Sequence, residues 1–159
     1  MISFKQHLNE STEFLYHGTS LDNAVKIIES GKLISTNSRS RDHDGVAGIS
    51  LTRSLKRAGD YGVVFIFSRS KLSDLDIRPH VNKSTTFYGD EEEEKIFLQK
   101  GSAISLQKYC DGFKLQAGYF RSKEDHVKGT FYRFSPRGPK VIAAIEQLSK
   151  SPLFLGTYS

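Results

Sequence analysis

Three kinds of side chain that could do chemistry lie near predicted strand or helix ends: a histidine, a tyrosine and a run of carboxylates. His17 follows Phe14, Leu15 and Tyr16, which favour a β-strand. Gly18 comes next, and without a Cβ it lets a planar ligand approach the backbone. We expect the N–H and C=O groups there to be able to hydrogen-bond a carboxamide. A single histidine at a strand end is more often only structural, so His17 alone does not define a site.

Tyr61 and the four carboxylates of residues 91–94 are the other two candidates. Tyr61 lies in a short predicted helix, and by itself it could equally be a half-buried packing residue. Four adjacent carboxylates usually form a solvated loop. Here they lead directly into the apolar residues 96–98, which predict a strand. Glu94 is therefore the candidate catalytic carboxylate, and Glu92 forms an E-x-E pattern with it.

Local signals place these residues on a series of strands and helices. Ser20 is the predicted N-cap of a helix over residues 21–29, with Gly31 as its C-terminal stop. Ser54 is the predicted N-cap of a short helix through Ala58 and Tyr61. The continuous apolar run of residues 63–67 predicts a buried central strand. The other expected elements are strands over residues 32–36, 48–52, 96–98 and 113–115, irregular chain over 68–90, and a closing amphipathic helix containing Val141, Ile142, Ile145 and Leu148.

This order of elements, with helices early and strands late, predicts an α+β fold rather than a doubly wound parallel sheet. No GxGxxG follows a strand and no GxxxxGK[ST] occurs, which argues against a Rossmann or P-loop nucleotide site. The 159 residues suit a single domain, residues 1–159. The one cysteine, Cys110, excludes an internal disulfide and a cysteine-based metal cluster. No segment has the apolar length of a signal peptide or a membrane span, so we expect a cytoplasmic protein without a metal or a membrane partner.

Taken together, the three candidates resemble the H-Y-E constellation of ADP-ribosyltransferases of the diphtheria-toxin and poly(ADP-ribose) polymerase type. Residues 16–19 read Y-H-G-T and match the first motif. Residues 48–61, from G-I-S-L-T to Tyr61, are similar to the second, with the same spacing between the glycine and the tyrosine. Glu94 and residues 95–97 are similar to the third. The resemblance covers residues 14–115, and small phage or prophage products of this superfamily also look similar.

The resemblance implies a fold of two packed, mostly antiparallel sheets with flanking helices, and NAD as a substrate. His17 would bond the adenosine ribose, and the Gly18 backbone the nicotinamide amide, with Thr19 and Ser50 also lining the NAD site. Tyr61 would stack on the nicotinamide ring. Glu94 would bind the ribose 2′-hydroxyl and stabilise positive charge as the nicotinamide–ribose bond breaks. These roles belong to the family and are carried here residue by residue.

The sequence departs from the polymerases at two positions and in length. Ser50 stands where those enzymes often have tyrosine, and Ala58 where a nicotinamide-binding serine is usual. The short chain favours transfer of one ADP-ribose over polymer formation. Two other classes remain open. A tRNA 2′-phosphotransferase also begins with a Y-H-G-T-like strand, but it needs a histidine that residues 48–51 lack. The other is a catalytically silent relative that binds a nucleotide or a partner.

The acceptor is predicted from charge and aromatic content rather than from a motif. Residues 116–159 hold 7 Lys/Arg against 3 Asp/Glu, whereas residues 1–115 hold 16 against 15. Aromatic and basic residues alternate over residues 119–140, as in surfaces that stack bases and neutralise phosphates. An amphipathic hairpin with inward aromatics would show the same pattern. We expect RNA or single-stranded DNA rather than protein as acceptor, with an inhibitor or antitoxin partner if the protein is a toxin. The candidate acceptor-binding residues are Glu92, Tyr88, Arg121, Lys128 and Arg133.

Overall fold

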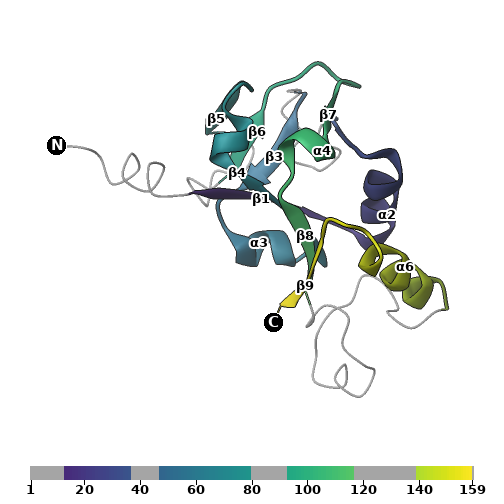
Figure 1. Ribbon diagram of the computed structural model, residues 1–159. Helices are drawn as coiled ribbons and strands as arrows, with labels where there is room; N and C mark the ends of the chain where they lie inside the picture. The colour runs from purple at the N-terminus through teal and green to yellow at the C-terminus, as the bar shows by residue number, and fades with distance from the viewer. Residues whose placement is uncertain (1–12, 37–46, 80–92, 117–138, 159) are drawn as a thin grey trace.

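The computed structural model describes residues 13–36, 47–79, 93–116 and 139–158, and this part of the chain is α+β, as expected (Figure 1). It contains a seven-stranded sheet, a two-stranded sheet, four α-helices and one 3₁₀ helix. The elements are β1 (Phe14–Thr19), α2 (Leu21–Ser30), β2 (Lys32–Ile34), β3 (Ile49–Thr52), α3 (Leu55–Gly59), β4 (Val63–Ser68), η1 (Arg69–Leu72), β5 (Ile77–Pro79), β6 (Glu93–Ile96), β7 (Ala103–Ser105), α4 (Leu106–Tyr109), β8 (Gly112–Gln116), α6 (Pro139–Ser149) and β9 (Phe154–Tyr158).

The large sheet has the strand order β5-β6-β3-β1-β4-β8-β9, and the small one pairs β2 with β7. Every neighbouring pair in the large sheet is antiparallel except β8 and β9, so this sheet is mixed. Strand β9 joins it at the edge beside β8, and α6 packs against α2. Residues 139–158 therefore belong to the same folded unit as the strands that carry the three motifs.

Helix α2 begins and ends where the sequence predicts. The Ser20 side chain accepts a hydrogen bond from the Asn23 amide at 3.3 Å, which caps the first turn. At the other end Gly31 has φ 67°, the left-handed conformation that glycine adopts without a Cβ clash, and its amide bonds the Ile27 carbonyl. Ser54 caps α3 in the same way by accepting from the Arg57 amide. Both predicted N-caps are confirmed.

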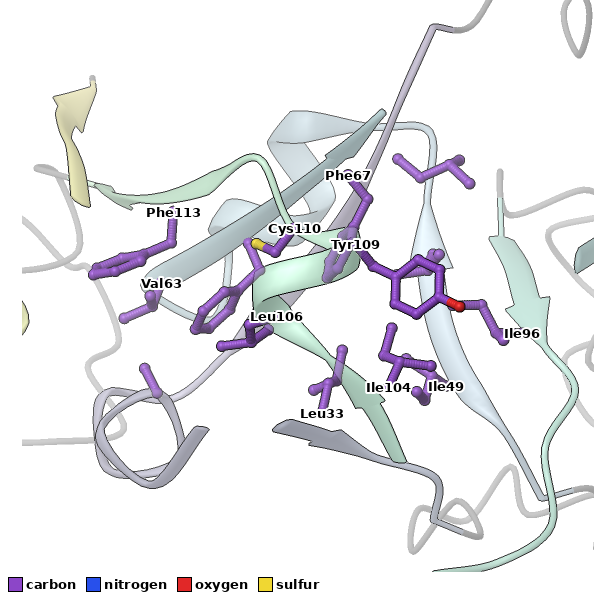
Figure 2. Close-up of a cluster of buried hydrophobic side chains, with 14 of the residues drawn as sticks. Leu33, Ile49, Val63, Phe67, Ile96, Ile104, Leu106, Tyr109, Cys110 and Phe113 are labelled. Atoms are coloured by element: carbon purple, nitrogen blue, oxygen red, sulfur yellow. The ribbon is translucent and has the colours of Figure 1, made fainter. Parts of the chain in front are cut away.

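The main core lies on one face of the large sheet. Strand β4 contributes Val63, Phe65 and Phe67, all fully buried, which confirms the predicted central strand. Figure 2 shows the side chains of β2, β7 and α4 meeting those of β3, β4 and β6 in one apolar cluster. Leu21 of α2 and Leu148 of α6 join this cluster. The small sheet, α2, α4 and α6 therefore cover the same face.

Helix α3 packs on β1, β3 and β4 from the opposite side. Side chains alternate between the two faces of a strand. Leu15 belongs to the core, so the side-chain direction of Gly18 is toward the other face. A Cβ built on Gly18 would lie 2.2 Å from the Ala58 carbonyl oxygen of α3. The absence of a side chain at Gly18 is what allows α3 to lie so close to β1.

Several predicted boundaries were wrong. The expected strand over residues 96–98 is β6, Glu93–Ile96, so Glu94 lies inside a strand and not in a loop before one. The backbone of Glu94 pairs with Leu51 on one side and Pro79 on the other, and this pairing overrides the weak strand propensity of glutamate. Residues 69–72 and 77–79, expected to be irregular, form η1 and β5. Strands β7 and β9 and helix α4 were not predicted.

In the ranges given above, no helix is long and apolar enough to cross a membrane.

Candidate functional site

The three strands that carry the motifs are consecutive neighbours in the large sheet. Strand β6 holds Glu94, β3 holds Ser50, and β1 holds His17 and Gly18, in the order β6-β3-β1. Leu51 is the cross-strand partner of Glu94, and Thr52 is the partner of Tyr16. Segments that are up to 77 residues apart in sequence are thus joined by backbone pairing.

His17 lies inside β1 rather than at its end, because β1 continues to Thr19 through its pairing with β4. The register of β1 with β3 is confined to Tyr16 and Thr52, whereas β1 pairs with β4 at six positions. The His17 side chain adds a second link to β3, since Nδ1 lies 2.9 Å from the Ser50 carbonyl oxygen. A carbonyl oxygen only accepts, so Nδ1 carries the proton in this bond.

Burial disfavours the charged form of His17 and lowers the pKa of the imidazole, an effect that outweighs the hydrogen bond to the Ser50 carbonyl, which raises it. The ring is therefore neutral at pH 7. With the proton on Nδ1, Nε2 of a neutral imidazole is an acceptor. A sugar hydroxyl of a nucleotide is one complementary donor.

Tyr61 follows α3 in a turn in which its amide donates to the Ala58 carbonyl at 3.3 Å. The Tyr61 ring lies against β1, because its Cδ2 is 2.8 Å from where a Gly18 Cβ would be. The side chain is nevertheless 53% exposed. An exposed aromatic ring held beside a glycine backbone can stack on a planar ligand whose amide reaches that backbone.

Glu94 is the most deeply buried carboxylate in the described residues, at 2% exposure. It lies on the same face as its cross-strand partner Leu51 and as Ile96, both core residues. Its Oε2 is 2.8 Å from Nη2 of Arg69, the first residue of η1. Arg69 supplies the positive charge that a carboxylate in such surroundings requires.

The structure brings His17, Gly18, Ser50 and Tyr61 together but divides them between two faces. By strand alternation, His17 lies on the core side with Glu94, whereas Tyr61 packs on the α3 side of Gly18. Strand neighbours are about 4.8 Å apart, so the backbones of β1 and β6, two strands apart, are separated by about 10 Å. His17 and Glu94 therefore lie on one face of the sheet, and Tyr61 lies on the other.

The remaining expected site residues have different positions. Thr19 is buried beside Val63, and Ser50 is exposed while its carbonyl accepts from His17. Glu93 lies on the face opposite Glu94, because its cross-strand partner is Thr52. The candidate acceptor residues Glu92, Tyr88, Arg121, Lys128 and Arg133 lie outside the described residues.

Two charged residues near the site were not singled out from the sequence. Arg69 follows an apolar strand directly, and a cation in that position could have been recognised as a partner for a buried carboxylate. Lys95 is 4% exposed on the face opposite Glu94, and its side chain occupies the space that a Cβ on Gly48 would need, with Cγ 2.7 Å from that position. Gly48 is the first residue of the second motif. Because it has no side chain, β6 can pack closely against the chain at the start of β3.

Within the ranges that the structure describes, no group of three or more His, Cys, Asp or Glu residues could hold a metal ion. No protein-family model and no curated protein matches this sequence.

The environment of His17 predicts a pH dependence of stability. The ordinary pKa of histidine is near 6.5, and the folded protein lowers it. Below pH 6.5 the unfolded chain therefore binds more protons than the folded one, and the free energy of unfolding falls as the pH falls through the folded-state pKa. His17→Asn keeps a donor for the Ser50 carbonyl but does not titrate. We expect urea unfolding from pH 7.5 to 5 to show a shallower loss of stability in this variant; an identical pH slope in both proteins contradicts the assignment.

Proposed function

We propose that this protein is an NAD-dependent mono-ADP-ribosyltransferase. The observation that carries the proposal is the adjacency of β6, β3 and β1, the three strands on which the H-Y-E-like motifs lie. Nothing in the local sequence requires these strands to be neighbours. Their adjacency joins a buried carboxylate and a neutral histidine, and the exposed ring of Tyr61 lies against Gly18 of β1.

Each side chain suits a separate part of NAD. Nε2 of His17 accepts a hydrogen bond from the adenosine ribose. The Tyr61 ring stacks on nicotinamide while the Gly18 backbone bonds the carboxamide. Glu94 accepts from the 2′-hydroxyl of the nicotinamide ribose, about two strand spacings from His17.

The reaction breaks the bond between the nicotinamide nitrogen and C1′ of the ribose. The electron pair of that bond leaves with neutral nicotinamide, and positive charge develops on the ribose. The carboxylate of Glu94 stabilises this positive charge. An acceptor lone pair then forms the new bond to C1′ and the acceptor releases a proton. Water in place of the acceptor yields ADP-ribose, a slow hydrolysis that can be measured without knowing the acceptor.

A nucleotide-binding protein without turnover is the second candidate. The burial of Glu94 favours this alternative, since a carboxylate that serves only the fold has no need to reach a ligand. Release of nicotinamide from NAD separates the two: the transferase releases it, and the silent relative binds without release.

Glu94→Gln is expected to reduce nicotinamide release by roughly 10²-fold or more, because it removes the charge and little of the volume. Chromatography of nicotinamide after incubation with NAD is the measurement, and circular dichroism checks that the variant is folded. Glu93→Gln is the matched control, since it lies one residue away on the opposite face. If Glu94→Gln retains full activity and Glu93→Gln loses it, the catalytic carboxylate is Glu93.

Tyr61→Ala is expected to weaken NAD binding and turnover far more than Tyr61→Phe, because the proposed contact uses the ring and not the hydroxyl. Tyr61 is 53% exposed, so both variants should fold. The measurements are the NAD dissociation constant by calorimetry and the rate of nicotinamide release. Equal damage in both variants would assign the role to the hydroxyl instead.

The proposed acceptor is RNA or single-stranded DNA, on the strength of the positive charge of residues 116–159. Reversal of Arg121, Lys128 and Arg133 to Glu should abolish transfer of labelled ADP-ribose to nucleic acid and spare NAD hydrolysis. Transfer by the unaltered protein should also fall steeply with salt. The matched control reverses the exposed residues Lys26, Lys32 and Lys100, an equal change in charge. Label in protein, insensitive to salt and to both triple variants, would reject nucleic acid as acceptor and leave the transferase proposal standing.

A further inference from the structure

The ion pair between Arg69 and Glu94 joins the residue that follows β4 to a strand three positions away in the sheet. Arg69 is the first residue of η1, and both ends of η1 are held in place. Its own amide donates to the Glu13 carbonyl at 2.9 Å, and Leu72 at the end of η1 is buried in the core. The Arg69 side chain is 31% exposed and that of Glu94 is 3% exposed. The arginine therefore reaches inward from the surface to a carboxylate in the sheet.

The contact engages one oxygen of the carboxylate. Arg69 Nη2 lies 2.8 Å from Oε2, but the two groups are not aligned as a hydrogen bond. Within the part of the chain that the structure describes, no hydrogen bond reaches Oε1. One oxygen is thus covered by the guanidinium, and the other keeps its capacity to accept a proton donor.

The ion pair between Arg69 and Glu94 is expected to add little to the free energy of unfolding. A buried ion pair repays the loss of hydration only with good geometry and with hydrogen bonds to its remaining polar atoms. Here the pair lacks the alignment, and the facing residue on β3 is the apolar Leu51. An apolar residue in place of Glu94 would suit this core face at least as well. A ligand hydroxyl that donates a hydrogen bond to Oε1 would account better for a carboxylate at this position.

We propose that Arg69 is the positioning residue for Glu94: it holds Oε2 so that Oε1 accepts the 2′-hydroxyl of the nicotinamide ribose. This inference rests on the proposed function. Arg69 acts through Glu94 and does not itself touch the substrate. A planar guanidinium with fixed donors orients a carboxylate more strictly than the flexible ammonium of lysine. The loss of Arg69 should therefore misplace the carboxylate and act mainly on turnover.

The test compares kcat and KM for nicotinamide release in Arg69→Ala, Arg69→Lys and Glu94→Gln, and in the double variant Arg69→Ala with Glu94→Gln. We expect kcat to fall roughly 10²-fold in Arg69→Ala, as for a misplaced catalytic group, with a much smaller change in KM. Arg69→Lys should retain an intermediate rate. The double variant should be no slower than Glu94→Gln, because both changes act on one group. Added methylguanidinium should restore part of the activity of Arg69→Ala.

Lys71→Ala is the matched control, because Lys71 lies in the same η1 and makes a 2.8 Å ion pair with Asp111 instead. It should leave kcat unchanged. The inference is overturned if Arg69→Ala turns over like the unaltered protein, or if its loss of activity follows a loss of thermal stability and methylguanidinium restores nothing. An unaltered protein that binds NAD but releases no nicotinamide refutes the proposed function, and the inference about Arg69 with it.

Discussion

The pairing of β1 between β3 and β4 is the constraint on which the rest of the structure depends. On one side β1 is joined to β4 along its whole length, and β4 is buried on both faces. On the other side it meets β3 at Tyr16 and Thr52 and is linked again by the His17 ring. The firm side anchors His17 and Gly18 in the sheet. On the loosely joined side, the strand pairing of β1 with β3 is confined to one residue pair.

Close packing on the second face follows from the same strand. Because Gly18 has no side chain, the Ala58 carbonyl and the Tyr61 ring can lie directly on β1. This contact holds an aromatic ring at the surface without burying it. A single glycine thus positions α3, and α3 positions Tyr61. From the sequence, Gly18 was expected to leave room for a ligand. In the structure, α3 and the Tyr61 ring occupy the space that a Gly18 side chain would fill.

On the core face, the main constraint is the compensation of a buried charge. Strand β6 places a carboxylate in line with core residues, and a charge there is unfavourable unless it is compensated. Arg69 compensates it from η1, a short helix fixed by Leu72 in the core. The desolvated imidazole of His17 lies on the same face, uncharged at neutral pH. The face therefore holds one buried ion pair and one neutral imidazole.

The sequence by itself determined the elements whose signals are local. The caps at Ser20 and Ser54, the stop at Gly31 and the apolar run of β4 each act within a few residues, and all were found where predicted. Tertiary structure alone decided that Glu94 lies inside a strand, that it faces the core while Tyr61 packs on the opposite face, and that Arg69 is its partner. These depend on pairing between segments far apart in sequence. Side-chain direction in a strand has a period of two residues, so a change of register by one residue would exchange Glu94 for Glu93, and no local signal fixes that register.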